Sequence, residues 1–326
     1  MQKNIVIFGG GTFSHVRSHL ALAAPAFGST AESIRDLCQE LIPEMNPHLY
    51  LTQMAGGYMG MITNDDVEKE VRKVIKDLDN KIVLFSCAMC DFCGNLLDKD
   101  GSSTNSGKYE KRLKTKNFHG KDNQGNVFDR HASIEIHPSK KVINMIRHDL
   151  GGRKDIFLVG FKTTCGATED EQYIAGLDLC KKASCNLVLA NDVKTRLNMV
   201  ITPEEARYHV TTDRDAVLRG LVEMTYLRSH LTFTRSTVVA GDSIPWKSEL
   251  VPESLRIVVD YCVRNRAYKV GPSGATVGHF AAKIGPTTFL TSKRKTNFND
   301  IEKLGLVKIE TDGPDKVIAY GAKPSV

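Results

Sequence analysis

The sequence lacks any long hydrophobic run. Its apolar stretches fall well short of the roughly 20 residues that cross a bilayer, so no membrane-spanning segment is expected. The first residues, MQKNIVIFGGG, have too short an apolar run and too many glycines for a signal peptide. They predict instead a strand at the start of the chain. Without either signal, we expect a cytoplasmic protein with no membrane partner.

Charge of one sign and aromatic residues are also scarce. The 326 residues carry a formal net charge of +6, and aromatic residues make up 7% of the chain. Basic residues cluster only near 108–116 and at 293–295, and no nucleic-acid motif or aromatic-basic array accompanies them. We therefore expect small-molecule partners and no nucleic acid. The length allows two domains or one large one.

The sequence has eight cysteines but no sign of a disulfide framework. In a chain without a leader they indicate reduced thiols. Three fall together as 87-CAMCDFC-93, directly after the apolar run 81-KIVLFS-86. No second CxxC or CxxH supplies a fourth metal ligand. We interpret these thiols as structural or site-lining groups at a strand end and predict no metal site; metal ligation and redox chemistry are the alternatives.

Short apolar runs alternate with helical patterns over the first two-thirds of the chain. The predicted strands are 4–8, 48–52, 82–86, 156–161 and 186–190, and the predicted helices are 29–41, 65–78, 140–150 and 170–183. This alternation is typical of an α/β fold with a Rossmann-like, doubly wound, mainly parallel sheet. Ligands of such sheets bind beyond the carboxyl ends of the strands.

Two segments interrupt the alternation. Residues 94–132 are polar and rich in Gly, Asn and Lys, and loops of this length are usually functional or disordered. Because this segment follows a strand end, we expect a mobile flap over the site. The composition changes again between Thr232 and Pro252, a range that contains Trp246, the only tryptophan.

This change of composition marks a domain boundary. We predict a nucleotide-binding domain over 1–235, a linker over 236–252 and a smaller α+β appendage over 253–326. Within the appendage, 253–266 has a helical pattern, and 287–290 and 306–310 are strand-like.

The first predicted strand ends in 9-GGGT-12. Glycines at Gly9, Gly10 and Gly11 allow backbone amides to approach phosphate oxygens, and Thr12 adds a hydroxyl donor. A tight turn without a ligand is the alternative. A Rossmann dehydrogenase or nucleotide-sugar enzyme is disfavoured, because the motif is not GxGxxG and no acidic residue closes 48-HLYLT-52.

An ordered set of further motifs resembles the phosphopantothenate–cysteine ligase (phosphopantothenoylcysteine synthetase) family over residues 1 to about 235. The motifs are 27-FGSTA-31, 88-AMCDF-92, 107-GKYEK-111, 132-ASIEI-136, 138-PSKKVI-143, 159-VGF-161 and 190-ANDV-193. Each is weak alone, and together they are specific. The resemblance implies coenzyme A biosynthesis: CTP or ATP, with Mg²⁺, activates 4′-phosphopantothenate as an acyl-nucleotide, and the amine of cysteine attacks it.

The resemblance also implies site residues. Lys108 matches the catalytic lysine of the family. The implied nucleotide-binding residues are Gly9, Gly10, Gly11, Thr12, Ala88, Asp91, Phe161, Lys181, Lys182, Asn191 and Asp192, and Gly28 and Ser29 are implied for substrate. For Asp192, bracing its own loop is an equal alternative. Family members dimerise through this domain, so the resemblance implies a homodimer.

The chain departs from the family pattern before Gly28. The family has an asparagine that holds the acyl-nucleotide, and 23-AAPAFG-28 places Ala24 there. Losing such a donor typically costs about 3–4 kcal/mol of transition-state stabilisation. Arg17 is suited to a substrate phosphate and is a candidate replacement. A catalytically weakened nucleotide-binding or regulatory protein on the same fold is therefore the alternative function.

The C-terminal residues show a fainter resemblance to the class II aldolase/adducin family. The parallels are 274-GATVGHFAAK-283, 290-LTSKRK-295, 305-GLVKIE-310 and 321-GAKPS-325. The family's glutamate after KPSS and its zinc-binding histidines have no counterpart, so no aldol or zinc chemistry is implied. We interpret 253–326 as a partial structural or oligomerising appendage.

Overall fold

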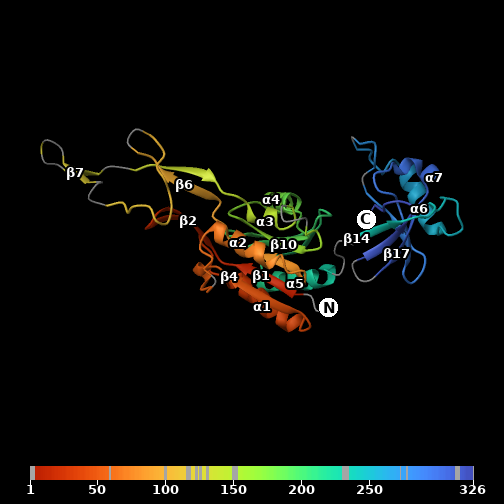
Figure 1. The fold of residues 1–326 in the computed structure, drawn as a ribbon, viewed down its shortest axis with the longest axis horizontal. Helices are drawn as coiled ribbons and strands as arrows, with labels where there is room; N and C mark the ends of the chain where they lie inside the picture. The colour runs from red at the N-terminus through yellow and green to blue at the C-terminus, as the bar shows by residue number, and fades with distance from the viewer. Residues whose placement is uncertain are drawn as a thin grey trace. The chain divides into compact units, whose positions relative to one another are not determined.

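The computed structural model divides the chain into two compact units, Met1–Ser229 and His230–Val326 (Figure 1). It describes residues 4–58, 60–98, 101–114, 119–121, 124, 127–129, 132–148, 153–229, 235–271, 273–276, 278–312 and 316–325. Parts of the predicted flap, at 99–100, 115–118, 122–123, 125–126 and 130–131, lie outside the described residues, as does the end of the predicted helix 140–150.

The first unit contains a seven-stranded sheet in the order β13-β12-β11-β10-β5-β1-β4. Its parallel strands are β4 (Asn46–Leu51), β1 (Asn4–Gly9), β5 (Asn80–Phe85), β10 (Phe157–Thr164) and β11 (Leu187–Asp192). These are the predicted strands, and the predicted α/β fold class is confirmed. The sequence analysis did not predict the antiparallel extension by β12 (Asn198–Ile201) and β13 (Arg207–Thr211).

Helices cover both faces of this sheet (Figure 1). Helices α1 (Ser29–Leu41) and α5 (Arg214–Ser229) contact each other and lie on one face. The other face carries α2 (Asn64–Val74), α3 (Val142–Met145) and α4 (Glu169–Lys182). The prediction of a helix over 140–150 was too long, since α3 forms a single turn. Helix α5 was not predicted, although Val217, Leu218, Leu221 and Val222 give it an apolar stripe.

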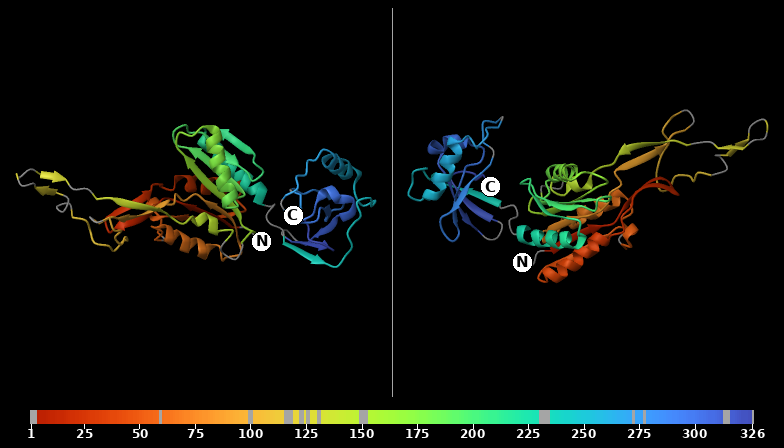
Figure 2. Two further views of the ribbon diagram at one scale, coloured as in Figure 1. Left: turned by 90° about the horizontal axis from the view of Figure 1, so that it is seen from above. Right: turned by 180° about the vertical axis from the view of Figure 1, so that it is seen from behind.

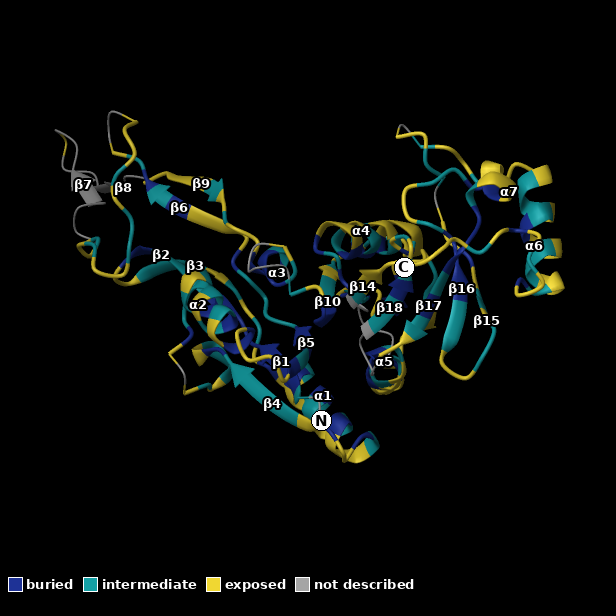
Figure 3. Ribbon diagram, turned by 45° about the vertical axis from the view of Figure 1, so that its right-hand side comes forward, coloured by how far each residue is buried: buried dark blue, intermediate teal, exposed yellow. Residues whose placement is uncertain are grey.

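The sheet is buried between two apolar layers. Figure 3 shows β1 and β5 buried at the centre of the unit. Side chains of a strand alternate between its two faces, so Ile5 and Ile7 pack on the α1/α5 side, whereas Val6 and Phe8 pack on the other side. The same alternation, which we call strand parity, determines on which face of the sheet each residue at a strand end lies.

Antiparallel ribbons extend from the carboxyl edge of the sheet (Figure 2). One joins β2 (Thr12–Arg17) to β3 (Leu20–Ala24), and another joins β6 (Phe92–Leu96) to β9 (Ile134–Pro138). The prediction of one long loop over 94–132 was therefore wrong at its start, because residues 94–96 belong to β6. Backbone pairing with β9 orders these residues, whose composition alone indicated a loop. A short pair, β7 (His119–Lys121) and β8 (Val127–Asp129), lies between them.

The second unit contains a five-stranded sheet in the order β14-β18-β17-β16-β15. Its elements are β14 (Arg235–Val239), α6 (Glu253–Arg264), β15 (Ala281–Lys283), β16 (Thr288–Thr291), α7 (Ile301–Leu304), β17 (Val307–Thr311) and β18 (Lys316–Tyr320). Trp246, in the range 236–252 predicted as a linker, is buried against Phe280 in the core of this unit. Among the described residues of either unit, no helix has the length and apolarity needed to cross a membrane.

Candidate functional site at the carboxyl edge of the sheet

At the carboxyl edge of the sheet, on the face that packs against α1 and α5, small and polar residues follow the last buried apolar residues of the strands. By strand parity, Gly9, Phe161, Thr163, Asn191 and Asn198 belong to this face, which they share with Ile7, Val159, Leu189 and Val200. Phe161 packs partly buried against that apolar layer, and the Thr163 hydroxyl donates to Asn191 Oδ1 at 3.2 Å. We refer to these five residues as the edge row. Three of them, Gly9, Phe161 and Asn191, were predicted from the sequence.

The N-termini of α1 and α5 meet beside the edge row. Gly28 precedes α1 in the left-handed conformation (φ +84°), and Ser29 begins the helix exposed to solvent. Arg214, the first residue of α5, donates to Asn198 Oδ1 at 2.8 Å and to Thr30 Oγ1 at 3.1 Å. The sequence analysis missed Arg214 and Asn198 because it predicted neither α5 nor β12.

The three glycines after β1 are sites of close packing. A Cβ atom at Gly9 would collide with Ala31 of α1, one at Gly10 with Thr52, and one at Gly11 with the backbone of Ala24. Gly10 also has a φ of +99°, which favours glycine. These contacts bring the start of α1 close to β1. They support the tight-turn interpretation of the motif and leave its role in nucleotide binding a prediction.

The hydroxyl of Thr12 is engaged inside the protein. Thr12 is fully buried; its Oγ1 donates to Asn64 Oδ1 at 2.6 Å and accepts from the Cys90 amide at 2.8 Å. Ala88 forms a parallel bridge with Gly11. Thr12 and Ala88 therefore join the β1, β5 and α2 segments of this edge.

Asp192 braces its own loop. Its carboxylate accepts hydrogen bonds from the amides of Gly166, Ala167, Lys194 and Thr195 and from the hydroxyls of Thr164 and Thr195. Hydrogen bonds, above all that from the Thr195 amide, hold the pKa of Asp192 far below its usual range. By parity its side chain belongs to the α4 face, so the carboxylate fixes the end of β11 from the side opposite the edge row.

The structure does not bring Lys181 and Lys182 to the edge row. Both lie in the last turn of α4, which leads to the amino end of β11. Lys181 pairs with Glu205, and Lys182 pairs with Asp178 at 2.8 Å. Their predicted contact with nucleotide stays a prediction without support from this arrangement.

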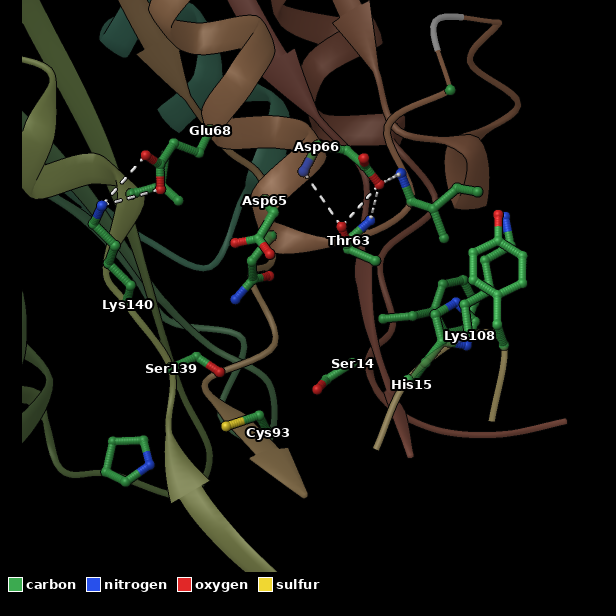
Figure 4. Close-up of a pocket in the computed structure, with 18 residues that line it drawn as sticks. Ser14, His15, Thr63, Asp65, Asp66, Glu68, Cys93, Lys108, Ser139 and Lys140 are labelled. Atoms are coloured by element: carbon green, nitrogen blue, oxygen red, sulfur yellow. Dashed lines mark hydrogen bonds and ion pairs between the residues drawn. The ribbon is translucent and has the colours of Figure 1, made fainter. Parts of the chain in front are cut away.

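Lys108 lies in a separate pocket on the α2 side of the unit. The pocket has a volume of about 630 Å³ and is lined by β2, the start of α2, the Lys108 turn and residues 138–142. In Figure 4, Lys108 and His15 lie on one side of the pocket, and Glu68 and Lys140 on the other. Lys108 is exposed, with its Nζ atom 6.0 Å from the centre of the Tyr109 ring.

The acidic side chains of this pocket are already engaged. Burial opposes ionisation of Asp66, but hydrogen bonds from Thr63 and Ile62 and the charge of Lys108 bring its pKa below the usual value. The carboxylate of Asp66 and the hydroxyl of Thr63 form a capping box at the start of α2. Burial likewise opposes ionisation of Glu68, and hydrogen bonds from Arg72 and Lys140 lower its pKa. Lys108 therefore shares its pocket with two ionised carboxylates that are bound to other donors.

Arg17 is committed to a structural role. The side chain is buried and donates to Val16 O at 2.8 Å, to Thr104 Oγ1 at 2.6 Å and to Asn105 O. These bonds fasten the segment before Lys108 to β2. The predicted contact of Arg17 with a substrate phosphate would require some of these bonds to be replaced.

Asp91 lies exposed at the start of the β6–β9 ribbon. It forms an ion pair with Lys141, and its carbonyl accepts from the Ser139 amide at 2.7 Å. Ala23, Ala24 and Asp91 line one shallow recess with Phe92 and Ile136. The position aligned with the family asparagine is thus next to Asp91, but its methyl group supplies no hydrogen bond.

The cysteines of the CxxCxxC run do not converge. Burial raises the pKa of Cys87 to about 12, Cys90 is buried, and Cys93 lines the Lys108 pocket. Among the described residues, no group of three or more His, Cys, Asp or Glu side chains is placed to hold a metal. The raised pKa of Cys87 disfavours the thiolate that metal binding and redox attack require.

Comparison with known proteins gives likenesses of structure only. No protein-family model and no curated protein matches the chain. The DNA/pantothenate metabolism flavoprotein from Streptococcus pneumoniae superposes with a TM-score of 0.53 at 14% identity, covering 71% of this chain and 100% of that one. The C-terminal domain of the coenzyme A biosynthesis bifunctional protein CoaBC gives a TM-score of 0.48 at 14% identity, covering 70% and 96%.

A Cab2 mutant in complex with phosphopantothenate-cysteine gives a TM-score of 0.45 at 12% identity, covering 70% of this chain and 86% of that one. The likeness to the flavoprotein establishes the fold of the first unit, which agrees with the family resemblance in the sequence. At 14% identity it does not establish the chemistry. The resemblance of residues 253–326 to the class II aldolase/adducin family stays a prediction.

Proposed function

We propose that the first unit binds CTP or ATP at the edge row and joins 4′-phosphopantothenate to cysteine. The observation that carries the proposal is that motifs far apart in the sequence meet at one edge of the sheet. Gly9, Gly28, Phe161 and Asn191 belong to four such motifs, and all lie where ligands of doubly wound sheets bind. The likeness of fold to the pantothenate metabolism flavoprotein supports the same choice.

The proposed reaction has two steps. A carboxylate oxygen of phosphopantothenate attacks the α-phosphorus of the nucleotide and releases pyrophosphate. The amine of cysteine then attacks the acyl carbon, loses a proton and releases the nucleoside monophosphate. Lys108 lies in the separate pocket on the α2 side. In this proposal its turn moves to the nucleotide, where the ammonium stabilises negative charge that develops in the first step.

Mg²⁺ fits this proposal as an ion carried by the nucleotide. Mg²⁺ in such sites is commonly bound by substrate phosphates, waters and one or two carboxylates. The described residues offer no dedicated cage, so in this proposal the phosphates and waters supply most ligands of the ion. When bound, the ion would neutralise charge on the triphosphate and the departing pyrophosphate.

A second candidate function follows from Ala24. This residue ends β3 opposite Thr12, in the recess that also contains Asp91. An alanine there cannot donate to an acyl-nucleotide, which favours a nucleotide-binding or regulatory protein with weakened ligase activity. Both candidates share the nucleotide, and they differ in turnover.

We also propose a cytoplasmic homodimer. Phe92, Ile134 and Ile136 on the β6–β9 ribbon are exposed apolar side chains, and burial of such a ribbon in a partner copy would remove them from water.

Pyrophosphate release tests the function. Purified protein is incubated with phosphopantothenate, cysteine, Mg²⁺ and either CTP or ATP. We expect release that depends on phosphopantothenate, is lost in Lys108→Ala and is kept in Lys76→Ala, a control at an exposed lysine after α2. Nucleotide binding without release would support the second candidate, and absence of binding would refute both.

A further inference from the structure

Arg214 differs from the arginines of the first unit that pair with carboxylates, and like Arg17 and Arg147 it binds neutral oxygens. Arg72, Arg153, Arg207, Arg219 and Arg228 each pair with a carboxylate. The guanidinium of Arg214 instead contacts only neutral oxygens, Asn198 Oδ1 and Thr30 Oγ1. Among the described residues, no carboxylate oxygen lies within 4.0 Å of it. Burial lowers the pKa of Arg214, and no neighbouring charge compensates for that burial.

The acidic neighbours of Arg214 are directed elsewhere. Asp213 Oδ1 accepts from the amides of Asp215 and Ala216, each at 3.0 Å, and so caps α5. Asp215 and Glu32 are exposed and form no ion pair with the arginine. The guanidinium therefore presents positive charge that the described residues do not neutralise.

The place of Arg214 is set by two neutral contacts. Asn198 pairs with Asn191 across β11 and β12, which puts the guanidinium at the edge row. Thr30 lies in the first turn of α1, whose N-terminus has no side-chain cap, whereas Thr63 caps α2 and Thr168 caps α4. The amides in the first turn of α1 and the guanidinium of Arg214 therefore lie close together as hydrogen-bond donors.

We infer that Arg214 binds phosphate oxygens of the nucleotide at the edge row, an inference that rests on the proposed function. A guanidinium has five N–H donors, and the two contacts above use one donor on each Nη atom. The remaining donors suit two oxygens of one phosphate group. Asn198 and Thr30 hold the guanidinium in place before the ligand arrives, so little side-chain entropy is lost on binding.

The place of Arg214 at the edge row distinguishes it from Arg17 and Arg147, which also bind neutral oxygens. A carboxylate partner would compete with phosphate, whereas amide and hydroxyl oxygens orient the guanidinium and leave its charge available. In the proposed reaction Arg214 is a binding residue for the nucleotide, and Lys108 acts at the reacting phosphate once its turn has moved there from the α2 side.

The experiment compares triphosphate and nucleoside. Dissociation constants of the full chain are measured by calorimetry for CTP, ATP, cytidine and adenosine, in the presence of Mg²⁺. For the nucleotide that the wild type binds, we expect Arg214→Gln to weaken triphosphate affinity about 10- to 100-fold. Affinity for the matching nucleoside should stay within about twofold, because the base and ribose do not contact the guanidinium.

Arg147→Gln is the matched control. Arg147 is buried to a similar extent and also binds neutral oxygens, Ser184 O, Asn186 Oδ1 and Lys154 O, but at the amino edge of the sheet. We expect it to leave triphosphate affinity unchanged. Arg214→Lys retains the charge and should recover part of the affinity, and it also serves as the charge test if the glutamine variant does not fold.

Each outcome decides the inference. Unchanged triphosphate affinity in Arg214→Gln overturns it while leaving the proposed function intact. An equal loss of triphosphate and nucleoside affinity also overturns it, because that result assigns Arg214 a purely structural role. If the wild type binds neither CTP nor ATP, the proposed function and the inference both fail.

Discussion

Substitution of Gly9 by alanine tests whether the glycine motif after β1 is a packing motif. A Cβ at this position would collide with the Cβ of Ala31 and lie 3.3 Å from Leu51 Cδ2. Both neighbours belong to the buried layer between β1, β4 and α1. Overpacking of a core typically costs about 1–3 kcal/mol. In a unit of this size, each kcal/mol lowers the melting temperature by roughly 2–4 °C.

A second substitution separates the collision from other effects of the alanine. Ala31→Gly removes the methyl group that Gly9→Ala would strike, at a cost of about 1 kcal/mol for glycine in a helix. The double variant should therefore be more stable than the sum of the single effects predicts, by about 1 kcal/mol or more.

Urea denaturation of the wild type, both single variants and the double variant measures this coupling. Additive effects, or a Gly9→Ala protein as stable as the wild type, would refute the packing argument. In that case the absence of a side chain at Gly9 would have to be explained by a ligand.

Three further predictions follow from the site and its supports. Asp155, which pairs with Lys81 at 2.6 Å and Arg153 at 2.8 Å, has a pKa lowered to about 2, because hydrogen bonds and charges from those partners outweigh burial. The stabilisation that ionised Asp155 contributes is present above about pH 4 and is lost as the pH falls toward 2. After allowance for solvent screening, this contribution is about 1–2 kcal/mol. In acid denaturation, the free energy of unfolding of Asp155→Asn should therefore depend less steeply on pH over that window than that of the wild type. Lys108→Ala should lower the rate of pyrophosphate release about 100- to 1,000-fold in stopped assays while nucleotide affinity changes little, and an equal loss of both would contradict its assignment. Arg17→Ala should increase hydrogen exchange at residues 104–110, because the buried guanidinium fastens that segment to β2; unchanged exchange would contradict this role.

The sequence predicted the parallel core of the first unit because its strands are continuous apolar runs. Ile5–Phe8 and Ile82–Phe85 are buried on both faces, so hydrophobicity alone marks them. Strands β12 and β13 were not predicted because they are short, with four and five residues. Only β13 is an edge strand of the sheet. Helix α5 followed them in the same unassigned range, and with it Arg214 was lost from the candidate site.

The ribbon formed by β6 and β9 escaped prediction for a different reason. Its strands are separated by a polar segment of more than thirty residues, and backbone pairing over that separation leaves little trace in composition. The sequence could mark 132-ASIEI-136 only through family resemblance. The alternation of Ile134, Glu135 and Ile136 is the physical signal of a strand, although all three residues are exposed in the structure.

Side-chain roles were harder to predict than the elements that carry them. The positions of their motifs placed Asp192 and Thr12 at the carboxyl edge of the sheet, where the structure has them. Their carboxylate and hydroxyl, however, accept hydrogen bonds from backbone amides of nearby loops and turns. The deciding quantity is the number of hydrogen-bond partners that the fold itself supplies. A side chain whose partners are all internal stabilises the edge, whereas one with unused donors is available to a ligand. Both Arg214 and Arg17 have internal partners, so their places in the fold separate the roles that we propose for them. Arg214 contacts Asn198 at the edge row, where the ligand is proposed, whereas Arg17 is bound to Val16, Thr104 and Asn105 and holds the segment before Lys108.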